Sequence, residues 1–342
     1  MAATVRDIGE FGLLAALRAA LPPAVAASDR LILGIGDDAA VWRPHPGERV
    51  VITTDSLTEG IHFNLAWTDW TSLGHKALAV NLSDLAAMGA APSIVTVSLG
   101  LRGTERVADL EALYTGLGAL AARWGVVVAG GDIVASPQAL GIHVTALGET
   151  RGGRVLTRAG ASAGDLIAVS GRLGAAAAGL RLLGEQDPAK RNATTAPLLI
   201  AAHLRPEPRV ALGAALLAIG ASAAMDLSDG LLGDLPKLLA ASGTTGVIDA
   251  ALLPVPAAVR ALYPGSWLDL ATRGGEDYEL LFTIPPKKWP AISAAATDLG
   301  ATVTRIGEIR PLARAITPLT LRDAAGIERP VEPGGWDHFG GA

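Results

Sequence analysis

The chain has 342 residues, of which 50% are hydrophobic and 18% charged, with a net charge of −5. This length predicts two domains, and the apolar share predicts a large buried core. The acidic balance excludes a sequence-independent nucleic-acid binder, which needs a basic face. Because the sequence contains no cysteine, disulfides, thiolate catalysis and zinc–sulfur sites are excluded as well.

We expect a soluble, cytoplasmic protein with no contact to a membrane. The first residues include Arg6, Asp7 and Glu10 before any apolar run, which is unlike a secretory signal peptide. The longest uncharged apolar stretch, residues 210–225, is too short to span a bilayer comfortably. We interpret this stretch as a buried helix.

Helices and strands alternate along the first half of the chain. The residue pattern predicts helices over 9–20, 72–89 and 107–124, and strands over 49–54, 93–101, 126–129 and 141–149. Ser72 is the expected cap of the second helix. Leu78, Leu82 and Leu85 share one arc of that helix, which is its expected core face.

A polar, glycine-bearing turn at residues 151–154 marks the expected boundary between a domain of residues 1–150 and a second domain of residues 151–342. In the second domain the pattern predicts strands over 166–169, 278–284 and 302–309, helices over 174–184, 207–220, 230–242 and 288–299, and a loop over 185–197. The alternation in both halves indicates an α/β or α+β class. The aromatic residues near the end of the tail, 330–342, predict that it docks on the body.

Acidic residues recur beside glycine or threonine where a strand or helix is expected to end or begin. The runs are Gly36-Asp37-Asp38, Thr53-Thr54-Asp55, Gly130-Gly131-Asp132, Asp226-Leu227-Ser228-Asp229-Gly230 and Gly274-Gly275-Glu276-Asp277, and Asp84 adds a carboxylate on a helix. Clustered carboxylates repel each other unless a cation lies among them, and Mg²⁺ takes oxygen ligands of this kind. Glycine lets backbone N–H groups approach a phosphate closely. The runs together indicate a site for metal-bound phosphates.

Each run also has a purely structural explanation. Asp37 and Asp38 are good turn residues, Asp84 fits a surface acid, and a lone histidine such as His62 is more often structural. Ser228 or Asp229 fits a helix cap, although the same helix start can bind phosphate. The chain has no P-loop motif, no complete dinucleotide fingerprint and no protein-kinase motif set. ATP would therefore need another scaffold.

The runs taken together resemble the thiamine-monophosphate kinase family, within the aminoimidazole ribonucleotide synthetase-like superfamily. The resemblance lies in GIGDDAAV (34–41), TTDSLTEGIHF (53–63), KALAVNLSDLAAMGA (76–90), GGD (130–132), LTRAG (156–160), HLRPEPRV (203–210), MDLSDGL (225–231), GGEDYELLF (274–282) and WDHF (336–339). It implies a two-domain α/β and α+β fold whose N-terminal sheet pairs with that of a second subunit in a homodimer. It also implies that ATP and several Mg²⁺ ions bind between the two domains, with K⁺ as a further candidate cation.

The resemblance implies site residues position by position. The implied metal ligands are Asp38, Thr53, Thr54, Asp55, Asp84, Asp132, Asp226 and Asp229. The implied ATP contacts are Gly131, Asp132, Arg158 and Ser228, and the implied substrate contacts are His62, Glu276 and Trp336. Asp37 and Asp277 are expected to have supporting roles.

The implied reaction is ATP plus thiamine monophosphate giving thiamine diphosphate and ADP. The acceptor phosphate has a second pKa of about 6 and is already mostly a dianion at neutral pH, so no catalytic base is expected. Three alternatives stay open at this point. They are an ATP-using superfamily member with another acceptor, a metal-dependent phosphohydrolase, and a non-catalytic nucleotide-binding or metal-storage module. The absence of cysteine counts against selenophosphate synthesis.

Overall fold

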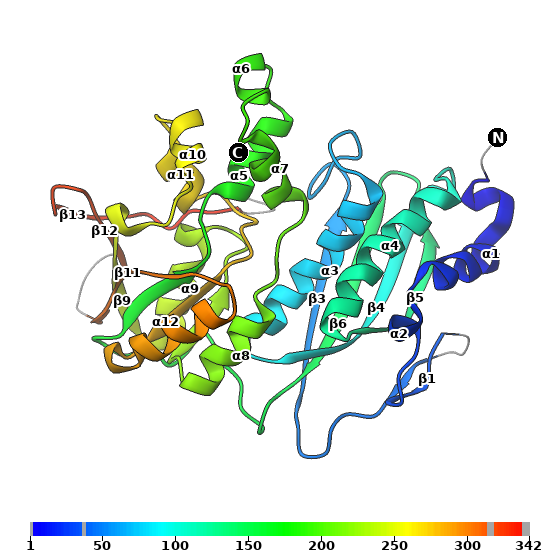
Figure 1. The fold of residues 1–342 in the computed structure, drawn as a ribbon, viewed down its shortest axis with the longest axis horizontal. Helices are drawn as coiled ribbons and strands as arrows, with labels where there is room; N and C mark the ends of the chain where they lie inside the picture. The colour runs from blue at the N-terminus through cyan, green and yellow to red at the C-terminus, as the bar shows by residue number, and fades with distance from the viewer. Residues whose placement is uncertain (1–2, 36–38, 313–317, 337–342) are drawn as a thin grey trace. The chain divides into compact units, whose positions relative to one another are not determined.

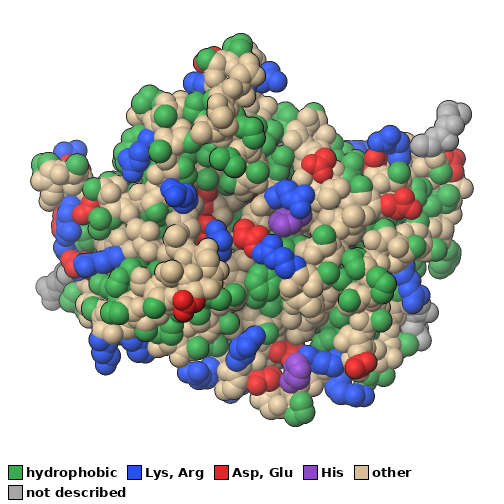
Figure 2. All heavy atoms as spheres, viewed as in Figure 1, with side chains coloured by type: hydrophobic (Ala, Val, Ile, Leu, Met, Phe, Trp, Pro, Cys, Tyr) green, Lys and Arg blue, Asp and Glu red, His purple; other side chains and the backbone are tan. Residues whose placement is uncertain are grey.

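The computed structural model describes residues 3–35, 39–312 and 318–336, and the chain forms two compact units. Unit 1 comprises residues 1–85 and 90–153, and unit 2 comprises residues 86–89 and 154–342. Within the described residues, no helix combines the length and apolar character that crossing a bilayer requires. Figure 2 shows acidic and basic side chains interspersed over the face drawn, which fits the absence of a broad basic surface there.

Unit 1 is built on a four-stranded sheet of order β3-β6-β4-β5. Its elements are α1 (Val5–Ala20), α2 (Pro23–Ala26), β1 (Leu31–Leu33), β2 (Val41–Trp42), β3 (Val50–Thr58), α3 (Trp70–Ala87), β4 (Ala91–Leu101), α4 (Val107–Trp124), β5 (Val127–Ala135) and β6 (Gly141–Glu149). Helices α3 and α4 lie on one face of this sheet (Figure 1). On the opposite face Val50, Ile52 and Val134 are 44%, 66% and 51% exposed, so apolar side chains there face outward.

The core of unit 1 confirms the predicted helix and strand faces. Leu78, Leu82 and Leu85 of α3 are fully buried, as the helical arc predicted. Alternate residues of β4 from Val95 to Leu101 are buried as well. Burial of aliphatic side chains contributes about 25 cal/mol per Å² of apolar surface, so these two faces supply much of the stability of the unit.

Helices α3 and α4 pack closely because glycines replace side chains at their contact. A Cβ on Gly116 would lie 1.9 Å from the Thr71 carbonyl oxygen, and one on Gly74 would lie 1.8 Å from that of Leu113. We therefore expect Gly116→Ala to lower the free energy of unfolding by about 2–4 kcal/mol, although alanine is the better helix former. Chemical denaturation measures this loss. Gly265→Ala is the control, because a methyl group there meets open space, and an equal loss in both variants would contradict the explanation.

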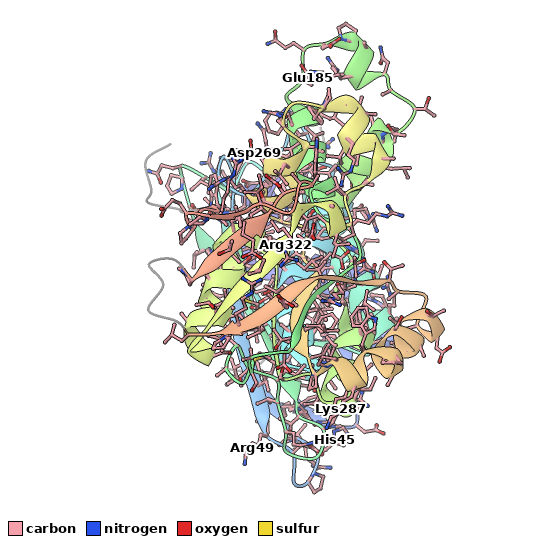
Figure 3. The ribbon with its side chains drawn as sticks, turned by 90° about the vertical axis from the view of Figure 1, so that its left-hand side faces the viewer. His45, Arg49, Glu185, Asp269, Lys287 and Arg322 are labelled. Carbon is pink, nitrogen blue, oxygen red and sulfur yellow. The ribbon has the colours of Figure 1, made fainter. Side chains whose placement is uncertain are left out.

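The short antiparallel pair of β1 and β2 is attached to the end of β6 through the buried Glu149 carboxylate. Glu149 accepts hydrogen bonds from Trp42 Nε1 at 3.1 Å and from the backbone N–H of His45 at 3.1 Å, and it pairs with Arg30. Figure 3 labels His45, which lies in the connection between β2 and β3. Glu149 thus fixes the segment that precedes β3.

Unit 2 contains a seven-stranded sheet of order β13-β12-β9-β11-β7-β10-β8. Its strands are β7 (Leu166–Ser170), β8 (Ala223–Asp226), β9 (Thr244–Asp249), β10 (Leu280–Ile284), β11 (Val303–Pro311), β12 (Leu319–Arg322) and β13 (Glu328–Pro330). Its α-helices are α5 (Ala175–Leu183), α6 (Pro188–Arg191), α7 (Ala196–Leu204), α8 (Val210–Ile219), α9 (Leu231–Ser242), α10 (Ala257–Leu262), α11 (Trp267–Thr272) and α12 (Trp289–Asp298). Arg322 on β12, labelled in Figure 3, pairs with Glu328 on β13 at 2.8 Å, so charged side chains protect this edge.

Several predicted boundaries were wrong. Asp55 and Asp132 do not end their strands, because β3 pairs with β6 as far as Thr58 and β5 pairs with β4 as far as Ala135. The apolar stretch 210–225 is not one helix, since Gly220 adopts φ 90° after α8 and the chain then enters β8.

Two predictions about where helices begin were also wrong. Ser72 lies inside α3, where its N–H donates to Asp69 Oδ1 at 2.8 Å, so the side chain of Asp69 and not that of Ser72 caps this turn. Residues 185–197, predicted as a loop, contain α6, which the Asp187 carboxylate caps. In both places an aspartate satisfies the first N–H groups of the helix.

Candidate functional site

An acid pair forms the centre of the candidate site in unit 1. Asp55 on β3 and Asp84 on α3 are close enough for the charge of one to act on the other. Thr53 is two residues before Asp55 and so lies on the same strand face, and its hydroxyl donates to Asp84 Oδ2. Burial, with a further contribution from the Asp84 charge, raises the pKa of Asp55 to about 6. A cation at this pair would relieve the repulsion and lower that pKa again.

Thr54 lies on the other face of β3. Its hydroxyl donates to the Val144 carbonyl oxygen at 3.1 Å and lies 3.1 Å from Thr145 Oγ1. Since successive side chains of a strand point to opposite faces, the Thr54 side chain is not brought to the acid pair.

The Gly130-Gly131-Asp132 run lies within β5, at the opposite edge of the sheet from β3. Gly131 packs against β4, where a Cβ would lie 1.9 Å from the Val97 carbonyl oxygen. Asp132 is exposed and pairs in register with Ser98, which pairs with His143. This row continues to Ser56, on the face that α3 and α4 do not cover. Within unit 1 the structure therefore does not bring Asp132 to Asp55.

His62 is held in a tight turn after β3. The backbone N–H of Thr58 donates to His62 Nδ1 at 3.0 Å, and Gly60 at φ 84° lets the chain turn. Because Nδ1 accepts this bond, the neutral ring carries its proton on Nε2. The ring orientation is thus fixed by the backbone.

In unit 2 the 226–230 loop and the 274–279 loop are joined by main-chain hydrogen bonds. The N–H groups of Glu276 and Tyr278 donate to the carbonyl oxygens of Ser228 and Leu227 at 2.8 and 2.9 Å. Asp226 ends β8 and pairs with Leu280 of β10. The structure thus brings together Asp226, Ser228 and Glu276, which the sequence placed some 50 residues apart.

Glycines are required where these loops meet. A Cβ on Gly275 would lie 2.5 Å from the Ser228 carbonyl oxygen, and one on Gly230 would lie 2.8 Å from that of Gly274. Glu276 itself adopts φ 68°, a conformation that non-glycine residues rarely take. Such strain costs on the order of 1–3 kcal/mol and concentrates at functional sites.

Glu276 has a buried histidine beside it that sequence reasoning did not assign to the site. His203, near the end of α7, places Nδ1 2.9 Å from Glu276 Oε2, and the side chains are 5% and 23% exposed. The signal available in the sequence was the 203–210 segment, which contains both His203 and Arg209. Arg209 makes a two-pronged pair with the buried Glu279 carboxylate, at 2.7 Å from Nε and 2.5 Å from Nη2.

Asp277 supports the loop by capping a helix. Its carboxylate accepts from the N–H groups of Gly174 at 2.7 Å and Ala176 at 3.1 Å, at the start of α5. Burial raises the pKa of Asp277 to about 7, against the effect of these hydrogen bonds. This geometry agrees with a supporting position.

The other predicted residues are placed as follows. Asp229 accepts from Lys237 Nζ at 2.6 Å, and Arg158 is exposed, with its carbonyl oxygen accepting from Ser242. Trp336 is 56% exposed, and its N–H donates to the Asp229 carbonyl oxygen at 3.1 Å, so the backbone of this residue lies against the 226–230 loop. Asp37 and Asp38 lie outside the described residues.

The oxygen donors of both units suit a hard cation better than a soft one. Among the described residues, no group of three or more His, Cys, Asp or Glu side chains forms a complete metal site. A pair of carboxylates with a threonine hydroxyl matches Mg²⁺, which is usually bound by one or two carboxylates and keeps several waters. Asp55, Asp84 and Thr53 therefore fit Mg²⁺.

A groove of about 610 Å³ lies elsewhere in unit 1, between α1 and α2. It is lined mainly by apolar side chains, including Phe11, Leu14 and Leu21. Because it holds none of the acidic runs, we place the candidate site at the acid groups and not in this groove.

Comparison with known proteins identifies the family of this chain. The family described as AIR synthase related protein matches the chain with its N-terminal domain over residues 36–150 and its C-terminal domain over residues 162–315. Thiamine-monophosphate kinase from Bacillus subtilis is 33% identical over 307 residues, covering 90% of this chain and 93% of its own. The chain belongs to the thiamine-monophosphate kinase family. The two-domain fold expected from the sequence motifs is thereby confirmed.

Two solved structures extend this relation. The crystal structure of thiamine-monophosphate kinase from Stenotrophomonas maltophilia has a TM-score of 0.81 at 40% identity, covering 92% of this chain and 96% of that one. A structure described as AaThiL complexed with AMPPCP and TMP has a TM-score of 0.75 at 32% identity and covers 98% of both chains. The family match thus includes both units.

Proposed function

We propose that this chain transfers the γ-phosphoryl group of ATP to thiamine monophosphate, giving thiamine diphosphate and ADP. The observation that carries this proposal is the relative complexed with AMPPCP and TMP, which matches the chain over 98% of its length. The acidic runs in both units support it, because a reaction between two phosphates needs cations. We further propose a homodimer in the cytoplasm, formed through the open face of the unit 1 sheet, which exposes Val50, Ile52 and Val134.

The chain's own residues serve to position the two phosphates and to hold the cations that neutralise them. Proton transfer by a side chain is a smaller part of their role. The acceptor phosphate has a second pKa of about 6 and is mostly a dianion at neutral pH, so it needs no base to become a nucleophile. Two phosphates at about 4 Å repel by several kcal/mol at a partly screened site. Bound Mg²⁺ would supply the positive charge that removes this repulsion and aligns the phosphates. Asp55 and Asp84, with the Thr53 hydroxyl, would hold it in unit 1.

The remaining assignments follow the sequence motifs. We propose Asp38, Thr54, Asp132 and Asp226 as further metal ligands, Gly131, Asp132, Arg158 and Ser228 as ATP contacts, and His62, Glu276 and Trp336 as substrate contacts. The motifs imply Asp229 as a metal ligand as well, but its carboxylate already accepts from Lys237 Nζ at 2.6 Å. The joined loops of unit 2 support the placement of Ser228 beside Glu276. Transfer is direct and in line, without a phosphoenzyme.

Product analysis tests the proposal. The protein is incubated with Mg²⁺, γ-labelled ATP and thiamine monophosphate, and the label is expected in thiamine diphosphate. Label released as inorganic phosphate without acceptor would indicate a phosphohydrolase, and label trapped on the protein would contradict direct transfer. Parallel incubations replace thiamine monophosphate with an aminoimidazole precursor or selenide, and ATP turnover only with one of these acceptors would indicate a different member of the superfamily.

His62→Ala is expected to raise KM for thiamine monophosphate by about tenfold, and by more than it raises KM for ATP. The reason is that the Thr58 N–H fixes the ring in the turn after β3, so the ring can contact the acceptor with little loss of conformational entropy. Steady-state kinetics with each substrate varied measures both constants. Arg49→Ala is the control, as an exposed side chain in the same unit. Equal changes in both constants would remove His62 from the acceptor side.

A further inference from the structure

Lys237 bridges two carboxylates at the start of α9. Its ammonium nitrogen lies 2.6 Å from Asp229 Oδ2 and 2.8 Å from Asp234 Oδ1. Asp234 is 1% exposed, and its other oxygen accepts from the backbone N–H of Asp229 at 2.9 Å. One lysine thus connects the 226–230 loop to the second turn of the helix that follows it.

The group places one ammonium between two carboxylates. Although burial acts in the opposite direction, the hydrogen bonds to Asp229 and Asp234 raise the pKa of Lys237 above its usual value. The ammonium therefore stays protonated at neutral pH.

The start of α9 and the Asp229 backbone also contact residues 334–336. Its carbonyl oxygen accepts from the N–H of Trp336 at 3.1 Å, and the N–H of Gly334 donates to the Leu232 carbonyl oxygen at 3.1 Å. A Cβ on Gly335 would lie 2.3 Å from the same Asp229 oxygen, so the two backbones are in direct contact. A displacement of Asp229 would move Trp336 with it.

We propose that the Lys237 ammonium, and not a metal ion, neutralises the Asp229 carboxylate and holds the 226–230 loop against residues 334–336. This inference rests on the proposed function and deepens it, because it moves Asp229 from the metal ligands to a positioning role. A metal ion at Asp229 would have to displace a cation that already makes two hydrogen bonds there. Asp229 and Lys237 would then act on the acceptor only through the placement of Trp336.

Metal binding distinguishes the two roles of Asp229. Bound Mn²⁺ is counted by electron paramagnetic resonance of the free ion, in the full chain with the non-hydrolysable ATP analogue AMPPCP. Asp229→Asn is expected to bind the same number of Mn²⁺ ions as the unaltered chain, whereas Asp55→Asn binds them at least about tenfold more weakly. A loss in Asp229→Asn equal to that in Asp55→Asn would overturn the proposal.

Hydrogen exchange tests the positioning role. Lys237→Met is expected to speed exchange of the Trp336 amide at least about tenfold and to lower the melting temperature by roughly 3–8 °C, whereas Lys237→Arg restores both. Unchanged exchange in folded Lys237→Met would overturn the proposal. Because neither experiment measures turnover, a failure of the kinase assignment is detected separately, by product analysis.

Discussion

Asp55→Asn is expected to reduce turnover by roughly 10²–10³-fold and at the same time to stabilise the metal-free protein. Turnover falls because the variant loses a charged oxygen from the proposed Mg²⁺ site. Stability rises because asparagine carries no charge into the half-buried position beside Asp84. The gain is on the order of 1–3 kcal/mol in the free energy of unfolding above pH 6.

The pH dependence of this gain identifies its cause. The pKa of Asp55 is about 6 in the folded protein, against an ordinary aspartate value of 3.8, so folding becomes less favourable as pH rises from 3.8 to 6. The advantage of Asp55→Asn is therefore complete above pH 6 and disappears as pH falls toward 4. Urea denaturation of the metal-free protein at several pH values measures it, with the exposed Asp29→Asn as control. A constant advantage over this range, or normal turnover at saturating Mg²⁺, would contradict the acid-pair explanation.

Arg209→Met is expected to lower the free energy of unfolding by about 2–4 kcal/mol, because it leaves the buried Glu279 carboxylate without its counter-ion. The Glu279 side chain is only 7% exposed and also accepts from Ser170 at 2.5 Å. Its carbonyl oxygen accepts from the N–H of Leu227, so a shift of Glu279 would disturb the 226–230 loop. Denaturation measures the loss, and turnover is expected to fall with it.

A double variant separates the loss of the pair from the loss of packing. Arg209→Met combined with Glu279→Gln is expected to recover most of the lost stability, since no charge then remains buried. Arg106→Met is the surface control, because Arg106 pairs with Asp109 but its side chain is 62% exposed, and it is expected to cost less than about 1 kcal/mol. Equal losses in Arg209→Met and the double variant would show that the charge is not responsible.

The helix and strand faces that depend on local periodicity, and the family that depends on motifs, were predicted from the sequence. The helical arc of Leu78, Leu82 and Leu85, the helix over 107–124 and the alternation in β4 follow from side-chain spacing alone. The apolar runs stop before Asp55 and Asp132, so the pattern predicted that the strands end there, and aspartate is indeed uncommon in strands. In the structure, β3 pairs with β6 and β5 pairs with β4 beyond these residues. Such pairing between distant segments is not visible in the local sequence pattern.

The partners of the motif acids could not be predicted in the same way. Lys237 lies eight residues after Asp229, and His203 lies 73 residues before Glu276, so no local spacing connects the members of either pair. The requirement for glycine at Gly230 and Gly275 was attributed to phosphate binding. In the structure, the same glycines also let two loops pack backbone against backbone.

The two loops of unit 2 are joined by main-chain hydrogen bonds, so the side chains of the 274–279 loop are not needed to hold them together. Because Glu276 and Tyr278 are attached to the 226–230 loop through N–H groups, their side chains can be exchanged without removing the bonds that fix the loop. A library that varies these side chains while keeping the glycines should therefore yield folded enzymes with altered acceptor preference, which makes this loop pair the natural starting point for redesign.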